Sequence, residues 1–132
     1  MANIYCGDVW FGGFDPTAGH EQAGRRPMLV VSPDGFNQGP LKLALVLPIT
    51  TNLRPLPPRI CFSPPEGSLT QASLALCEAI WPVSHDRLER RMGTVSADTL
   101  EVVQDRLRIL LNLQNGPPLQ SEKAGRFVGA CA

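Results

Sequence analysis

Short apolar runs separated by turns rich in glycine and proline make up most of the chain before residue 96. The runs in 28–32 and 43–49 are almost continuously apolar, which is typical of strands buried on both faces. The bulky segment 8–14 and the short segment 59–62 predict two more strands, the latter at an edge of the sheet. Alternating apolar positions in 73–80 predict a further strand.

The period of the apolar positions changes near the end of the chain. Segment 97–113 places leucine and valine at helical spacings on one face and charged residues on the other, which predicts an amphipathic helix. Ser96 is a good N-cap for it, and Asn115 with the following glycine and prolines would end it. The charged segment 83–92 predicts a short helix or turn, and 93–95 a last short strand.

Two local features refine the predicted strands. Gly12 and Gly13 indicate a bulge or a close approach of another backbone segment. Pro27 can begin a strand but not lie at its centre, so the second strand is expected to start at Met28.

The order of the elements, several short strands followed by one terminal helix, predicts a mainly β domain. Short strands joined by tight turns favour a small closed or half-closed barrel. We expect this domain to span 1–113 and the aperiodic segment 114–132 to be a flexible C-terminal tail.

Composition supports a folded domain and narrows its partners. The chain has 132 residues, of which 43% are hydrophobic and 18% charged, and this favours one globular domain over a disordered chain. Twelve basic residues balance twelve acidic ones. Bulk charge therefore does not indicate nucleic-acid binding, and any site for a polyanion must be a local cluster.

The four cysteines form no CxxC pair, and no histidine lies near one at the spacing of a zinc finger. We therefore expect no metal site and no cofactor. Cys61 and Cys77 lie in apolar runs and are predicted to be buried free thiols. The first residues do not form a signal peptide, and no apolar run approaches the ~20 residues of a membrane span. These observations predict a cytoplasmic, reducing location.

The polar loop 15–27 is the first candidate site. It combines His20, Glu21, Arg25 and Arg26, whereas a structural turn needs only glycine, proline or asparagine. Arginine binds phosphate through its planar fork of donors, and histidine can transfer protons near neutral pH. Salt bridges of the arginines within the loop, and a histidine that merely lies at the surface, are the alternative interpretations.

Two further candidates follow buried segments. Thr50 and Thr51 lie at the end of an apolar strand, where their hydroxyls can bind a ligand or cap the turn. Glu78 interrupts an apolar strand, so its carboxylate needs an arginine partner or a position facing a ligand. The sequence contains no GxGxxG, Walker, HExxH or GxSxG motif, which argues against the commonest nucleotide-binding, metalloprotease and α/β-hydrolase sites.

These motifs resemble those of the MazF/PemK (Kid) toxin family. The stretch 14–27 contains the ordered core Glu-Gln-Ala-Gly-Arg-Arg-Pro, and Leu-Pro-Ile-Thr-Thr at 47–51 resembles the family's Pro-hydrophobic-Thr segment. The similarity covers about residues 4–113, with further matching segments at 7–10, 29–33 and 88–113.

The resemblance implies an SH3-like barrel with a C-terminal helix, a homodimer, and the toxin of a type II toxin–antitoxin system. It implies a ribosome-independent endoribonuclease that cuts single-stranded RNA without a metal or cofactor. The 2′-hydroxyl would attack its own phosphate and leave a 2′,3′-cyclic phosphate and a 5′-hydroxyl. It further implies a cognate antitoxin that covers the RNA groove.

The resemblance also assigns roles to single residues. Arg26 would stabilise the pentavalent phosphate, and Thr50 would hydrogen-bond the phosphate or assist proton transfer. His20 would lie beside the scissile group, and Glu21 would orient the arginine or act as an acid or base. The expected RNA-binding residues are Gln22, Arg25, Thr51, Arg54 and Glu78.

The match departs from the Kid branch at two positions. Leu76 stands where Kid has an arginine, and Ala79 stands where it has a glutamine. Catalysis led by that arginine cannot operate here, whereas the MazF-type pairing of Arg26 with Thr50 is intact. Two alternatives stay open: a gyrase-binding poison of the related CcdB type, and a weakened toxin that only binds its antitoxin or RNA.

Overall fold

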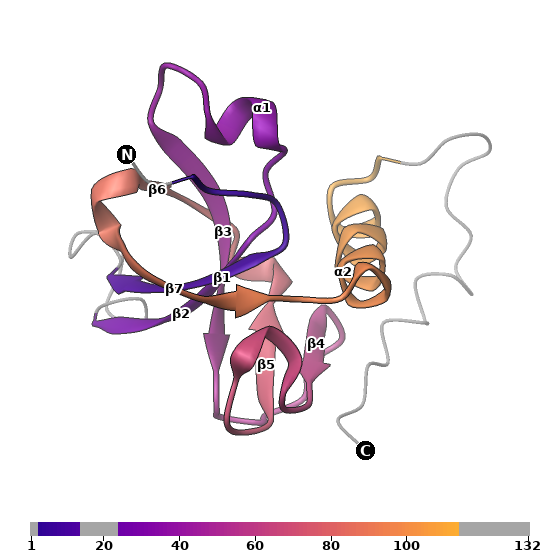
Figure 1. Cartoon of the computed structure of the whole chain (residues 1–132). Helices are drawn as coiled ribbons and strands as arrows, with labels where there is room; N and C mark the ends of the chain where they lie inside the picture. The colour runs from indigo at the N-terminus through magenta and orange to yellow at the C-terminus, as the bar shows by residue number, and fades with distance from the viewer. Residues whose placement is uncertain (1–2, 14–23, 114–132) are drawn as a thin grey trace.

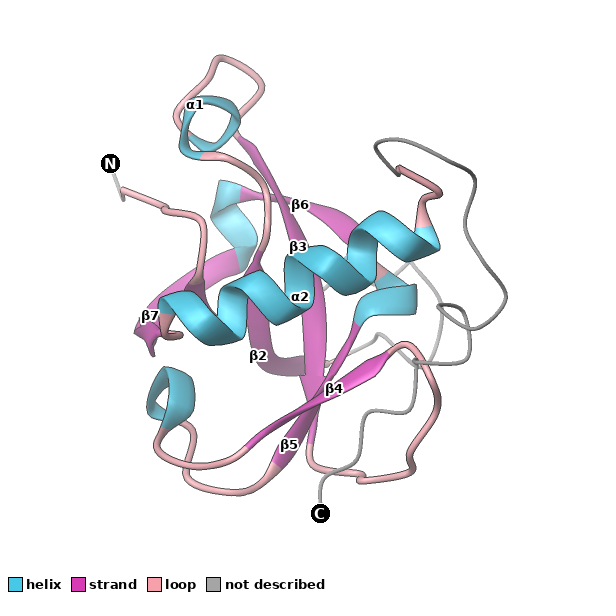
Figure 2. Ribbon diagram, turned by 90° about the vertical axis from the view of Figure 1, so that its right-hand side faces the viewer, coloured by secondary structure: helices cyan, strands magenta, loops and turns pink. Residues whose placement is uncertain are grey.

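The computed structural model describes residues 3–13 and 24–113, which form an antiparallel sheet with one long helix against it (Figures 1 and 2). The helices are α1 (Asp34–Asn37) and α2 (Ala97–Leu110), with 3-10 turns η2 (Glu66–Ser68), η3 (Cys77–Ala79) and η4 (His85–Arg87). The strands are β1 (Asp8–Gly13), β2 (Arg25–Val30), β3 (Leu43–Thr50), β4 (Arg59–Phe62), β5 (Ser73–Leu76), β6 (Trp81–Ser84) and β7 (Leu88–Thr94). The predicted mainly β fold with a C-terminal helix is confirmed.

The sheet has the strand order β4-β5-β3-β2-β1-β7, and β6 pairs separately with β3. Every pairing is antiparallel. Strands β4 and β7 stand at the two ends of this order, and no pairing joins them within the described residues. The sheet is therefore not closed, which excludes the fully closed form of the predicted barrel.

Strand β3 is central and changes neighbours along its length. Its first half, up to Val46, pairs with β6, and its last two residues, Ile49 and Thr50, pair with β5. Pro48 lies between the two pairings and faces Met28 of β2 on the other side. A proline fits there because a residue without an N–H costs no ladder hydrogen bond where one side of the strand is unpaired.

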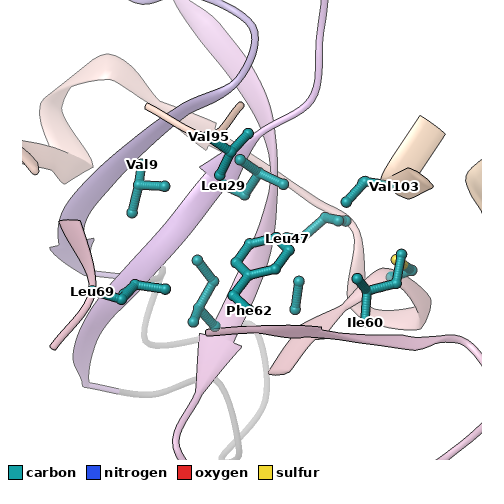
Figure 3. Packing of buried hydrophobic residues seen from close by; sticks show 11 residues of the cluster. Val9, Leu29, Leu47, Ile60, Phe62, Leu69, Val95 and Val103 are labelled. Atoms are coloured by element: carbon teal, nitrogen blue, oxygen red, sulfur yellow. The ribbon is translucent and has the colours of Figure 1, made fainter. Parts of the chain in front are cut away.

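The continuously apolar strands are buried on both faces, as their sequences predict. In β2, Leu29 belongs to one hydrophobic cluster, whereas Met28 and Val30 belong to another on the opposite face. Helix α2 covers the first cluster and contributes Val103 to it (Figures 2 and 3). The first cluster consists of Val9, Leu29, Leu47, Ile49, Ile60, Phe62, Leu69, Ala75, Cys77, Val95 and Val103.

Strand β2 begins three residues earlier than predicted, at Arg25, and contains Pro27. At Pro27 it pairs with Phe11 of β1, but its ladder with β3 starts only at Met28. One side of β2 is thus unpaired at Pro27, so the missing N–H of the proline does not prevent the strand from including it.

The segment predicted as a short helix or turn, 83–92, contains the end of β6, the 3-10 turn η4 and most of β7, so the prediction is right for His85–Arg87 and wrong for the residues on either side. Two of its charged residues, Arg90 and Arg91 of the edge strand β7, have partners on β1. The Arg90 guanidinium lies 5.4 Å from the centre of the Phe11 ring. Arg91 forms an ion pair of 3.3 Å with the buried carboxylate of Asp8. The single strand predicted over 73–80 also ends early, at Leu76, where η3 begins.

The predicted close approach of another backbone segment is confirmed at Gly12. A Cβ atom at this position would lie 1.9 Å from the carbonyl oxygen of Arg87, and the β1–β7 register shifts beside it. Only glycine lets the two strands approach this closely.

Helix α2 begins as predicted and ends earlier. The Ser96 side chain accepts a hydrogen bond from the Thr99 N–H, as an N-cap does. The helix ends at Leu110 because Asn112 adopts a left-handed φ of 59°. The N–H groups of Asn112 and Leu113 then donate to the carbonyls of Ile109 and Arg108, the pattern of a Schellman cap.

The cysteine prediction is half right. Cys77 is buried and free. Cys61 is only half-buried on the edge strand β4 and is disulfide-bonded, so it is not the free thiol that we expected. No helix in the described ranges has the length and apolar character needed to cross a membrane.

Candidate active site

A cavity of about 400 Å³ opens where β3 changes its neighbour from β6 to β5. One wall comes from β2 and the end of β3, and the other from β4, β5 and η3. The lining residues are Arg26, Thr50, Asn52, Arg59, Leu76, Glu78 and Ala79. The cavity therefore joins two of the candidate residues from the sequence, Arg26 and Thr50, with a third, Glu78.

The register of the sheet explains why Arg26 and Thr50 meet. Met28 lies opposite Pro48 in the antiparallel β2–β3 ladder. The β2–β3 pairing ends at Met28 and Pro48; extending its register by two residues along each strand places Arg26 across from Thr50, with both residues on the face of Met28. The intervening pair, Pro27 and Ile49, points to the other face and lines a different, smaller cavity.

The Arg26 side chain lines this cavity and has one buried donor without a partner among the described residues. The residue is half-buried, and its Nε atom is buried without a hydrogen-bond partner among the described residues. Burying a hydrogen-bond donor without an acceptor costs free energy unless a ligand supplies the acceptor. An anion bound in the cavity would supply that acceptor.

The Thr50 hydroxyl is oriented by its own turn. Its Oγ1 atom accepts a hydrogen bond of 3.1 Å from the backbone N–H of Asn52. A hydroxyl has one hydrogen to donate and two lone pairs. The contact with Asn52 uses a lone pair, so the hydroxyl hydrogen can be donated to a ligand in the cavity. Thr50 thus caps the turn and can still bind a ligand.

The opposite wall is built around an ion pair. The Arg59 Nε atom lies 2.9 Å from a carboxylate oxygen of Glu78, and Arg59 Nη1 donates to the carbonyl of Arg54 at 3.3 Å. Glu78 therefore has an arginine partner and also lines the cavity, which are the two positions that its sequence context allowed.

Comparison with known proteins identifies the family. Residues 5–111 match the model of the PemK-like, MazF-like toxins of type II toxin–antitoxin systems. The chain belongs to this toxin family. It is 30% identical over 106 residues to the endoribonuclease toxin MazF of Escherichia coli K12, covering 80% of this chain and 91% of that protein. It is 31% identical over 112 residues to the endoribonuclease MazF9 of Mycobacterium tuberculosis, covering 81% and 95%.

Solved structures of the toxin family have the same fold. MazF of Deinococcus radiodurans is 28% identical and superposes with a TM-score of 0.73, covering 85% of this chain and 99% of that one. The MazF chain of a MazE–MazF structure from the same organism superposes with a TM-score of 0.71 at 28% identity, covering 86% and 100%.

The other predicted residues of the PemK/MazF-like toxin fall in different places. Arg25 points away from the cavity, lies 5.6 Å from the centre of the Phe11 ring and forms an ion pair with Glu89 of β7. Thr51 lines the smaller cavity of about 100 Å³. Arg54 is exposed on the loop after β3, and its carbonyl rather than its side chain contacts Arg59.

Three predicted residues of the toxin, His20, Glu21 and Gln22, lie outside the described residues, as does the predicted tail 114–132. No group of three or more histidine, cysteine or acidic residues in the described ranges is arranged to hold a metal ion.

The sequence did not single out Arg59 or Asn52 as site residues. Arg59 opens the strand predicted at 59–62, but nothing local shows that its side chain reaches η3. The one available signal was Glu78, whose position in an apolar strand required a basic partner from elsewhere.

Proposed function

We propose that this chain is the toxin of a type II toxin–antitoxin pair and an endoribonuclease that cleaves single-stranded RNA in the cavity of Arg26 and Thr50. Its relatives in Escherichia coli and Mycobacterium tuberculosis carry the name endoribonuclease, and the chain covers nine tenths or more of their length. Cleavage would take place in the cytoplasm, within domain 1–113.

The observation that carries the proposal is a cavity of net positive charge lined by Arg26, whose buried Nε has no hydrogen-bond partner among the described residues. Two guanidinium groups, of Arg26 and Arg59, face one carboxylate, of Glu78, which leaves one positive charge among the lining residues. An RNA phosphodiester carries one negative charge, and a guanidinium binds it through two parallel hydrogen bonds.

In the proposed reaction, the ribose 2′-oxygen attacks the adjacent phosphorus and loses its proton to a base. The bond from phosphorus to the 5′-oxygen breaks, and that oxygen takes up a proton. The products are a 2′,3′-cyclic phosphate and a 5′-hydroxyl. Charge on the non-bridging oxygens grows in the transition state, and donors fixed beside them lower its energy.

The described residues supply donors for those oxygens. Arg26 offers its guanidinium, and Thr50 donates its hydroxyl hydrogen because Asn52 already occupies a lone pair. His20 and Glu21 are the proposed carriers of the two protons, and Gln22 a contact for the RNA chain. No metal ion has a role in this scheme.

The test is cleavage of a mixed-sequence single-stranded RNA transcript in EDTA. Arg26→Ala is expected to lower the single-turnover rate ~10²–10³-fold, because it removes a donor to the transition state. Thr50→Val, which keeps the shape and loses the hydroxyl, is expected to lower the rate ~10-fold or more. Arg108→Ala is the charge-matched control, since Arg108 lies on α2 and pairs with Asp105.

Three outcomes would contradict the proposal. Wild-type rates for Arg26→Ala would remove the assigned site. Growth arrest with intact RNA and trapped gyrase–DNA complexes would instead favour a CcdB-like poison. Binding of RNA or antitoxin without any cleavage would favour the weakened toxin. End-group analysis of the products gives a separate check of the 2′-hydroxyl mechanism.

The proposed partners are a cognate antitoxin and a second copy of the chain. The structural relatives include a MazE–MazF structure from Deinococcus radiodurans. We expect the antitoxin to cover the RNA groove and the toxin to act as a homodimer. Co-expression with the protein encoded by the neighbouring gene, followed by co-purification and an RNA cleavage assay, tests the antitoxin.

A further inference from the structure

We propose that Arg59 is a second phosphate-binding residue of the cavity and that Glu78 is the residue that positions it. The proposal rests on the RNA-cleaving function proposed above and extends its site to a strand that the sequence motifs do not include. Four observations carry it: the register of β4 with β5, the contacts of the guanidinium, its limited exposure, and the charge balance of the cavity.

The register brings Arg59 to the cavity wall. Arg59 is the first residue of β4 and pairs with Leu76, the last residue of β5. Glu78 follows two residues later, in η3. Leu76 is uncharged, so the positive charge of this cavity wall comes from Arg59 on the neighbouring strand β4.

The contacts that Arg59 makes with described residues fix its guanidinium and leave further donors for a ligand. Nε donates to Glu78 and Nη1 donates to the carbonyl of Arg54. A guanidinium has five N–H groups. These two contacts hold the plane of the group and leave hydrogens on both terminal nitrogens for an anion in the cavity. The side chain is 19% exposed, which is low for an arginine on an edge strand.

The charge balance argues that Arg59 does more than neutralise Glu78. An ion pair this close to the surface contributes little stability by itself. Without Arg59, the charges of Arg26 and Glu78 would cancel, and Glu78 would repel a bound phosphate. Arg59 therefore gives the cavity its net positive charge.

The experiment compares Arg59→Ala, Arg59→Lys and the double variant Arg59→Ala/Glu78→Gln with the wild type and the Arg108→Ala control. We expect Arg59→Ala to lower kcat/KM for the RNA transcript ~10²-fold or more, and Arg59→Lys ~10-fold, because lysine keeps the charge and loses the fork of donors. Thermal unfolding monitors folding, and Arg59→Lys is the variant to rely on if the alanine variant is unstable.

The double variant separates a direct role from a neutralising one. Removing both charges leaves Arg26 alone in the cavity. If Arg59 binds phosphate, the double variant stays at least ~10-fold below wild type in kcat/KM. Full recovery would mean that Arg59 only neutralises Glu78, and it would overturn the proposal. Binding of the transcript with 2′-O-methyl riboses, which cannot be cleaved, should weaken in parallel.

Glu78 has its own readout. As a positioning residue, Glu78→Gln should lower activity in the wild-type background and cause no further loss in Arg59→Ala, and the pH profile of kcat/KM should keep its shape. If adding Glu78→Gln to the Arg59→Ala variant changes the shape of the pH profile, Glu78 acts as an acid or base, and its assigned positioning role is overturned.

The two proposals fail in different ways. If Arg26→Ala is impaired while Arg59→Ala cleaves like wild type, the RNA-cleaving function stands and the role of Arg59 is wrong. If neither variant changes the rate, the cavity is not the site, and both proposals fall together.

Discussion

At the scale of single residues, Arg25 and Arg26 show how one position along a strand decides a role. Successive side chains of a strand point to opposite faces. Arg25 therefore lies over Phe11 and pairs with Glu89, whereas Arg26 enters the cavity beside Thr50. The sequence offered both arginines as candidates, and the alternation of β2 separates them.

The thiol of Cys77 gives a pH-dependent stability. Burial raises the pKa of the Cys77 thiol from 9.0 to about 12. Two smaller influences act in opposite directions: Arg106 lowers this pKa and Glu78 raises it. The folded state therefore holds the proton longer than the unfolded state. This stabilisation is complete below pH 9 and is lost as the pH rises toward 12, by at most about 1.4 kcal/mol for each pH unit.

The measurement is the free energy of unfolding in urea between pH 8 and pH 10.5. Cys77→Ala is the comparison variant, since it lacks the thiol and leaves the other titrating groups in place. We expect the wild type to lose more stability than the variant over this range. Parallel pH dependence of the two proteins would contradict the burial of a protonated thiol.

At the scale of elements, the sequence predicted the helix and the strands whose apolar pattern lies within their own residues. Helix α2 has a regular apolar stripe and an N-cap serine, and the buried strands β2 and β3 have continuous apolar runs. Strand β7 has neither, because Glu89, Arg90 and Arg91 follow one another and are all exposed, so no alternation of buried and exposed positions is visible. Its strand state depends on pairing with β1, which the local sequence does not contain.

The N-cap of α2 gives a prediction for stability. Ser96→Ala removes the acceptor for the Thr99 N–H and is expected to cost about 1 kcal/mol in the free energy of unfolding. Ser84→Ala is the matched control, because Ser84 precedes η4 and makes no side-chain cap hydrogen bond. Equal effects of the two substitutions in urea unfolding would contradict the capping role.

At the scale of the whole molecule, the cavity combines residues far apart in the chain. Arg26 and Thr50 could be predicted from sequence motifs, since each lies in a recognisable segment. That they share a cavity with Arg59 and Glu78 could not be predicted, because it depends on the register of β4 with β5 and on the turn of η3 after Leu76. Long-range register is fixed by packing of the sheet rather than by any one strand.

The change of neighbours along β3 divides the strand pairing of the sheet into two parts. One part holds Arg26 and the other holds Arg59, and the strand pairing between them consists of Ile49 with Ala75 and Thr50 with Leu74. We call these two paired positions the seam. RNA bound to both arginines would link the two parts of the sheet across it. We expect amide hydrogens of β4 and β5 to exchange faster than those of β2 in free protein, and to slow selectively when uncleavable RNA binds. Equal slowing in all strands, measured by mass spectrometry, would show that the ligand does not bridge the seam.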